Sequence, residues 1–167
     1  MSAAPLPPFQ AFLDDNREAV WRFLVSSVGR TEAEDCFQET FIAALRAYPR
    51  LRGAEREHNL RAWVLTIAHR KALDAHRART RRAVPVAEPD PAIAPGTPQG
   101  APERAAIDGE LWEAVQQLPE RQRSAVVLRF IGDLPHRDIA AAMGCSEEAA
   151  RRSLHEGLGK LRRTVRT

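Results

Sequence analysis

The chain has 167 residues, with 25 Lys and Arg against 22 Asp and Glu, which gives a net charge of +3. Its apolar content of 44% is enough for a core, but it has no run of about 18 apolar residues, which excludes a membrane span. The first ten residues, MSAAPLPPFQ, lack the basic and apolar segments of a signal peptide, so we expect a cytoplasmic protein without membrane insertion.

The charges are unevenly distributed along the chain. Residues 14–39 hold seven acids against three arginines, whereas residues 69–82 and 151–166 each hold six basic residues against one acid. Two separated basic patches favour contact with nucleic acid at two places over two solvated helix faces. Cys36 and Cys145 have no metal-ligand spacing, so we expect buried small residues, no metal and no cofactor.

The segment TEAEDCFQETFIAAL predicts the first informative helix. Thr31 and Glu34 form a capping-box pattern, which predicts that the helix begins near residue 31. Apolar residues then recur at helical spacing and predict a buried stripe of Phe37, Phe41, Leu45 and Tyr48. The other face carries Asp35, Gln38, Glu39, Ile42 and Arg46. The polar residues fit a solvated surface, whereas the isoleucine within the stripe indicates a protein-docking face, and the pattern alone leaves both interpretations open.

Residues 59–82, NLRAWVLTIAHRKALDAHRARTRR, predict a second helix. It begins with a predicted buried stripe of Leu60, Trp63, Val64, Ile67 and Ala68 and then becomes basic. Arg70, Arg77 and Arg81 share a face, and Asp74 is expected to pair with Arg70 one turn away. Trp63 has two interpretations, stacking on an unpaired base or packing in the core, and the core is favoured by about two to one.

Residues 83–102, AVPVAEPDPAIAPGTPQGAP, hold six of the twelve prolines. Proline removes an amide donor from a helix, and few residues here can form a core, so we predict a linker. It would span roughly 25 Å as a flexible coil and about 60 Å when extended. We therefore expect two small all-α domains, 8–82 and 103–167, that stay independent in the free protein unless a partner clamps them together.

The second domain shows the pattern of a helix-turn-helix. Two amphipathic helices, ERAAIDGELWEAVQQL and PERQRSAVVLRFIGD, precede a short helix that Pro135 opens. Gly144 ends the short helix, and Ser146 caps a last helix. The predicted buried stripe of this last helix is Ala150, Leu154, Leu158, Leu161 and Val165. In such a motif, the first two turns of the last helix enter the major groove.

The last helix opens with two acids, Glu147 and Glu148, which is unexpected for a helix that meets DNA. The helix dipole stabilises acids in the first turn by about 0.3–1 kcal/mol each. Alternatively, a glutamate accepts a hydrogen bond from the amine of cytosine. We expect one acid to read a base and the other to cap the helix. Further along, Gly157 and Gly159 are each expected to cost the helix up to about 1 kcal/mol.

Three segments resemble, in the right order, the bacterial RNA polymerase sigma factors of the extracytoplasmic-function group. EAEDCFQETFIAAL resembles the segment that binds core polymerase, and LRAWVLTIAHRKALDAHRARTRR is similar to the one that recognises and melts the −10 element. The third segment resembles the domain that reads the −35 element; it is LPERQRSAVVLRFIGDLPHRDIAAAMGCSEEAARRSLHEGLGKLR. The match covers most of residues 10–82 and 103–165. It implies a protein that binds core polymerase and directs promoter-specific transcription initiation.

The resemblance also implies roles for single residues. The clamp of the largest polymerase subunits would contact Asp35, Gln38, Glu39 and Ile42. The −10 strand would lie along Arg61, Trp63, Arg70 and Arg77. The −35 duplex would face Arg137, Ser146, Glu147, Glu148, Arg151, Arg152 and His155. The implied partners are core RNA polymerase, promoter DNA and an anti-sigma protein that holds the factor inactive.

Two other classes of protein remain as alternatives. A stand-alone transcriptional regulator would use only the C-terminal helix-turn-helix, and it leaves the EDCFQETF helix without a role. An enzyme acting on nucleic acid needs a Gly-rich phosphate loop, a metal-ligand cluster or an activated nucleophile, and the sequence has none of these patterns. We therefore expect no catalysis by the chain itself.

Overall fold

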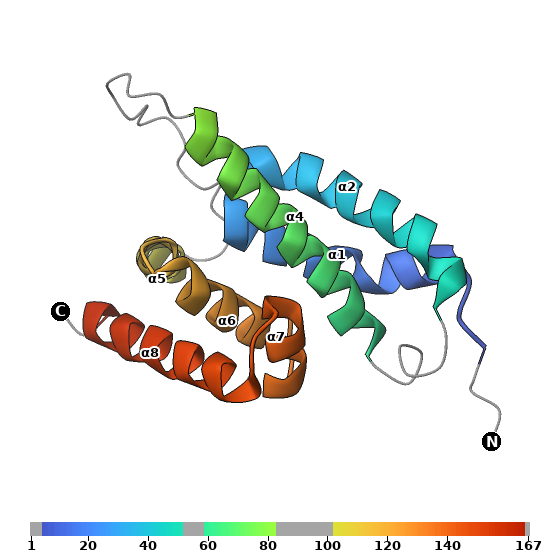
Figure 1. The fold of residues 1–167 in the computed structure, drawn as a ribbon. Coiled ribbons are helices and arrows are strands. Elements are labelled where there is room, and N and C mark those ends of the chain that lie inside the picture. Colours follow the sequence, from blue (N-terminus) through green and yellow to red (C-terminus); the bar gives the residue numbers. More distant parts are fainter. Residues whose placement is uncertain (1–4, 52–58, 83–101, 166–167) are drawn as a thin grey trace.

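The computed structural model describes residues 5–51, 59–82 and 102–165, and every regular element within these ranges is a helix. The order is α1 (Phe9–Val28), α2 (Arg30–Ala47), the short 3-10 helix η1 (Tyr48–Arg50), α4 (Leu60–Arg82), α5 (Pro102–Gln116), α6 (Glu120–Phe130), α7 (His136–Met143) and α8 (Glu147–Val165). The all-α prediction is confirmed. We call α1 to α4 the N-terminal unit and α5 to α8 the C-terminal unit (Figure 1).

None of the helices in the described part of the chain is long and apolar enough to cross a membrane.

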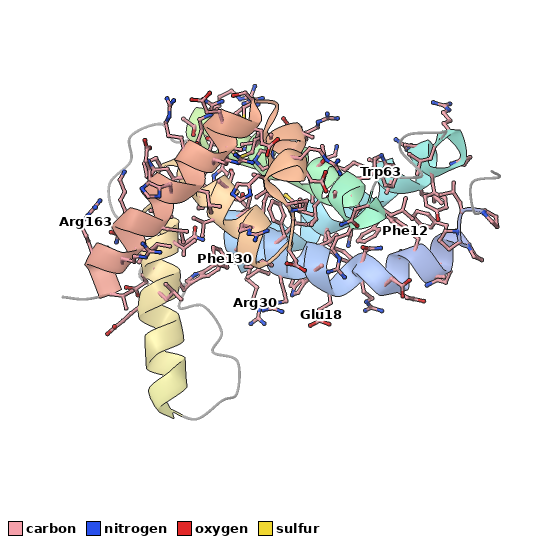
Figure 2. The ribbon with its side chains drawn as sticks, turned by 90° about the horizontal axis from the view of Figure 1, so that it is seen from below. Phe12, Glu18, Arg30, Trp63, Phe130 and Arg163 are labelled. Atoms are coloured by element: carbon pink, nitrogen blue, oxygen red, sulfur yellow. The ribbon has the colours of Figure 1, made fainter. Side chains whose placement is uncertain are left out.

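In the N-terminal unit, α1, α2 and α4 pack against one another around a shared core (Figure 1). Phe23 and Leu24 of α1 and Leu65 of α4 are fully buried, and each such side chain contributes about 1.5–3 kcal/mol to stability. One end of this core is aromatic: the ring centroids of Phe12 and Trp63 lie 5.8 Å apart, close together in Figure 2. Trp63 is thus partly buried in an aromatic cluster.

Two predictions for α2 are wrong. The expected capping box does not form, because α2 begins at Arg30 and is preceded by Gly29, whose φ of 83° lies in the left-handed region. Leu45 is 53% exposed rather than buried. The buried side of α2 consists instead of small residues, which allow a close approach to α1 and α4: Ala33, Cys36, Thr40 and Ala44, together with Phe41. The buried Thr40 hydroxyl donates to the carbonyl of Cys36 at 2.6 Å.

The C-terminal unit contains the predicted helix-turn-helix. Gly144 adopts the left-handed conformation after α7, with φ of 62°, and the Oγ of Ser146 accepts a hydrogen bond from the amide of Ala149 at 3.1 Å. Glycine tolerates this φ and serine satisfies an amide of the first turn of α8, so both residues explain the sharp turn. Val165, predicted in the buried stripe of α8, is 58% exposed because it borders an open groove.

Gly157 marks a close contact between α8 and α6. A Cβ atom at Gly157 would lie 3.0 Å from the Cγ2 of Val126 and 3.3 Å from the Cβ of Gln122. A side chain at this position would therefore force its neighbours on α6 to move by a few tenths of an ångström. The loss of helix propensity expected for this glycine, up to about 1 kcal/mol, is offset by the packing that it allows.

The two units pack against each other, so the expectation of independent domains is wrong. At this boundary, which we call the seam, α4 contacts α7, and α1 contacts α5 and α6 (Figure 1). The Nε2 of His69 lies 3.1 Å from the Oγ of Ser124. Leu65 lies against Gly132, where an added Cβ would come within 2.9 Å of the leucine Cδ1. The apolar pattern of α4 locates its buried residues but does not reveal that a second unit shares them.

Candidate nucleic-acid interface

The N-terminal end of α8 carries the residues expected to read DNA. Arg151 and Arg152 each pair with an acid one turn earlier: Nη2 of Arg151 lies 2.6 Å from Glu147 Oε1, and Nη2 of Arg152 lies 3.4 Å from Glu148 Oε1. The four side chains are 46–86% exposed, so each pair is worth only about 0.3–0.5 kcal/mol. The acids therefore have a third role besides those expected, because they orient and partly neutralise the arginines.

Three more of the expected residues surround these pairs. The Oγ of Ser146 is engaged by the amide of Ala149, so it serves the backbone. His155 is exposed one turn after Arg151. On α7, the Arg137 side chain is 72% exposed, and its Nε lies 3.6 Å from Oδ1 of the buried Asp138. This contact holds the Nε end of the guanidinium group against the protein surface.

The basic residues of α4 are spread along one long helix. Arg61 and Trp63 lie near its start and are partly exposed, whereas Arg70 and Arg77 are exposed further along. Arg77 lies sixteen residues after Arg61, which corresponds to about 24 Å along the helix axis. A strand of nucleic acid that follows this helix would meet several of them in turn.

The ion pairs of α4 differ in part from the prediction. Asp74 lies 3.8 Å from Arg77 instead of pairing with Arg70, and an acid that precedes its basic partner is the better orientation in a helix. Arg79 donates to Oε1 of Glu32 on α2 from both Nε, at 2.8 Å, and Nη2, at 2.6 Å. Arg79 therefore connects two helices, while the exposed Arg70 and Arg77 face solvent.

An acidic face with an apolar patch lies on α2, on the side of the N-terminal unit opposite to α6 and α8 (Figure 1). Its exposed polar residues include Asp35, Gln38 and Glu39. Lys71 of α4 lies 3.7 Å from Glu39, whose side chain is still 61% exposed. Ile42 is 49% exposed and Leu45 is exposed one turn away. The face therefore combines accessible carboxylates with exposed apolar side chains.

The electrostatic effect of these acids extends to the core beneath them. Burial raises the pKa of the Cys36 thiol to about 11, and the carboxylates of Glu39, Glu32 and Asp35 add to this rise. The thiol is therefore protonated at neutral pH and behaves as a small apolar residue, as expected.

The sequence patterns missed an apolar groove between α5, α6 and α8, with Ser26 of α1 at its edge. The groove has a volume of about 910 Å³. Its rim exposes Leu111 and Val165, and Phe130 is 64% exposed there. The available signal is the run AVVLRFI at residues 125–131, which has more apolar positions than one buried stripe uses.

Comparisons with known proteins identify the family. Residues 12–82 match the family model for Sigma-70 region 2, and residues 108–161 match the model for Sigma-70, region 4. The ECF RNA polymerase sigma factor SigD of Mycobacterium tuberculosis is 32% identical over 159 residues, which cover 90% of this chain and 73% of SigD. The chain belongs to the extracytoplasmic-function (ECF) sigma factors.

Other relatives agree with this family. The ECF RNA polymerase sigma factor SigX of Bacillus subtilis is 28% identical over 163 residues, which cover 93% of this sigma factor and 82% of SigX. The sigma factor RpoE from Bartonella quintana, solved in complex with the anti-sigma factor NepR, has the same fold, with a TM-score of 0.78 at 23% identity over 95% of this chain and 97% of RpoE. As an ECF sigma factor, the chain binds core RNA polymerase and promoter DNA and directs transcription initiation, which confirms the function implied by the resemblance.

Proposed function

We propose that this sigma factor makes its three main contacts through three separate surfaces. The face of α2 binds core polymerase, the exposed residues of α4 bind the −10 element, and the start of α8 with Arg137 reads the −35 element. The observation that supports this division is the distribution of charge, because α2 is acidic where α4 and α8 are basic. A polyanion is attracted to the basic helices and repelled by the acidic face, which suits a protein partner instead.

The α2 face has the composition of a protein-docking surface. Ile42 is half exposed beside accessible carboxylates, of which Glu39 is the most clearly placed, with its side chain 61% exposed. Exposed apolar groups surrounded by polar ones are typical of surfaces that bind protein. We assign Asp35, Gln38, Glu39 and Ile42 to the clamp of the largest polymerase subunits.

The α4 helix suits a single strand better than a base-paired groove. Arg61, Arg70 and Arg77 supply charge over about 24 Å for phosphates. The Trp63 ring packs on Phe12 and keeps an exposed part, so a base pulled out of the duplex can stack on that part. We therefore assign these four residues of α4 to the −10 strand.

The start of α8 suits the major groove. Arg151 and Arg152 project from its first two turns, where a recognition helix meets the edges of bases. Each arginine must break its weak ion pair with a glutamate before it can contact DNA. A DNA contact weaker than that ion pair is therefore unfavourable. We propose that Glu147 and Glu148 thereby reduce binding to unspecific phosphates and sharpen the choice of base.

We assign the apolar groove of the C-terminal unit to a second contact with core polymerase. A groove between helices with exposed Leu111, Phe130 and Val165 suits the apolar face of an amphipathic helix. An anti-sigma protein that covers the groove or the α2 face would compete with polymerase, and the RpoE relative is solved with such a protein. The proposed domains are 8–82 and 103–167, joined by 83–102, and the proposed location is the cytoplasm.

Run-off transcription on genomic DNA tests the proposal. Core polymerase with the full-length chain is expected to start transcription at discrete sites that share two upstream elements. Core polymerase alone is not expected to start at these sites. A stand-alone regulator would give a different result: the chain would bind specific duplex sites without polymerase, and the starts made by added core would share no −10 element.

A further inference from the structure

Polar and apolar contacts hold the two units together at the seam. The Nε2 of His69 on α4 lies 3.1 Å from the Oγ of Ser124 on α6, and the amide of Gln116 donates to the carbonyl of Ser26 on α1 at 2.5 Å. The side chain of Leu65 packs against the turn at Gly132. The buried cluster runs through both units. The free chain therefore has a specific packed arrangement.

This arrangement is too small to span a promoter. A compact chain of 167 residues has a radius of gyration of about 15 Å and a diameter of roughly 40 Å. The centres of the −10 and −35 elements are about 25 base pairs apart, which is roughly 85 Å along straight DNA. The twenty residue steps from Arg82 to Pro102 can extend to about 66 Å. Separation of the units is therefore necessary, and the length of the chain permits it.

His69 lies at the centre of the seam. Its side chain is 5% exposed, and its Nδ1 makes no hydrogen bond of good geometry among the described residues, although the backbone of Ala142 lies close enough to act on it. Around it are the ring of Phe23 from α1, at 6.4 Å between centroids, and the backbone of Ala142 from α7. The charged groups that act on it are Glu120 of α6 and Arg70 of its own helix. A proton added here would introduce a charge into a largely apolar site.

We propose that the packed arrangement is a closed state of the free sigma factor, unable to read both promoter elements, and that neutral His69 at the seam holds it closed. Separation of the units removes Ser124 from the imidazole and admits water. Protonation of His69 therefore favours the open state. The compactness of the free chain does not depend on the proposed DNA-binding residues, whereas the consequence for promoters rests on the proposed function.

The direction of the pH effect follows from linkage. Burial lowers the pKa of His69 below its usual value of 6.5, and Arg70 adds to this, against the opposite effects of Glu120 and the backbone of Ala142. In the open state the imidazole regains an ordinary pKa, so the open state takes up a proton first as the pH falls. The closed state is thus fully favoured above pH 6.5 and is weakened below it. Between pH 7.5 and 5.5 the ratio of closed to open chains should fall by up to about tenfold.

Small-angle scattering of the full-length chain tests this inference. The wild type should have a radius of gyration near 15 Å at pH 7.5 and a larger value at pH 5.5, with unchanged helix content by circular dichroism. His69→Gln, which stays neutral, should remove the pH dependence. The matched control His155→Gln, at an exposed position of α8, should keep it.

A second variant covers the case in which His69→Gln does not fold. Ser124→Ala removes one hydroxyl from a partly exposed position of α6 and should expand the chain already at pH 7.5. An expanded wild type at pH 7.5 would overturn the closed state. Three results would overturn the role of His69. The wild type could be compact at both pH values, a folded His69→Gln could show the same pH dependence as the wild type, or Ser124→Ala could be as compact as the wild type at pH 7.5.

Binding to DNA separates this inference from the proposed function. Arg151 and Arg152 are exposed in the closed state, so binding to a duplex with only a −35 element should be the same for Ser124→Ala and the wild type. With core polymerase and a two-element promoter, the variant should bind more tightly by the ratio of its open fraction to the wild-type open fraction, which is at most about tenfold if 90% of the wild-type chains are closed. Equal affinity on both DNAs, despite an expanded variant, would overturn the inhibitory effect alone.

Discussion

Replacement of Arg151 by alanine should relax the choice of base in the −35 element without unfolding the C-terminal unit. The arginine is 63% exposed and makes a 2.6 Å pair with Glu147, so its loss should cost the fold only about 0.3–0.5 kcal/mol. A bidentate contact to guanine is worth about 1–3 kcal/mol, from which the release of the pair subtracts a few tenths. The variant should therefore bind the preferred site about 3- to 80-fold more weakly.

Binding to a set of −35 duplexes, each with one changed base pair, measures this effect. Arg151→Ala should lose discrimination at particular positions. The matched control is Arg163→Ala, twelve residues or about 18 Å further along α8, where Figure 2 shows the side chain directed away from the helix bundle. That variant should weaken binding evenly for all sequences and reduce its salt dependence slightly. An unchanged base profile for Arg151→Ala would refute the placement of this helix in the groove.

Three further expectations concern other positions. Glu39→Lys should reduce co-elution with core polymerase, whereas the equivalent reversal at Glu18, an exposed residue of α1, should not; equal co-elution would argue against docking on α2. Gly157→Ala should lower the free energy of unfolding by up to about 2 kcal/mol, since crowding against α6 exceeds the gain in helix propensity. Gly159→Ala meets only an ordinary contact at 3.8 Å and should raise the free energy of unfolding by up to about 1 kcal/mol. Equal shifts in melting temperature for the two variants would contradict the close contact at Gly157. Glu148→Gln should change base preference if this acid reads a base, whereas a small loss of stability with unchanged preference would indicate a local role only.

The helix-turn-helix could be predicted almost to the residue because its signals are local. A left-handed φ at Gly144 and a side-chain cap at Ser146 each depend on a few neighbouring residues. The same holds for the pairs between Glu147 and Arg151 and between Glu148 and Arg152. Their spacing of four residues was visible in the sequence, and the pairing rule for helices predicts them. The helix dipole and the reading of a base, which were the two roles expected for these acids, do not include this pairing.

The errors in α2 arose where local signals competed with packing. Thr31 is a good capping residue, but α2 begins one residue earlier, after Gly29, because the glycine allows a sharp turn directly from α1. Leu45 matched the apolar period, yet the close approach of α1 and α4 requires the small side chains on the neighbouring stripe. Periodicity locates a face only approximately, and the sizes of residues on both sides decide which stripe is buried.

The seam and the groove were missed for a different reason. Their residues are mostly apolar. An apolar residue that contacts another unit, or that is exposed at a binding surface, has the same pattern in the sequence as an apolar residue in a core. Leu65 and Phe130 illustrate this, because one is fully buried at the seam and the other is 64% exposed at the groove. Charged residues are costly to bury, so their positions in the pattern locate exposed surfaces reliably. A sequence therefore indicates where a protein meets charged partners more readily than where its own domains meet each other.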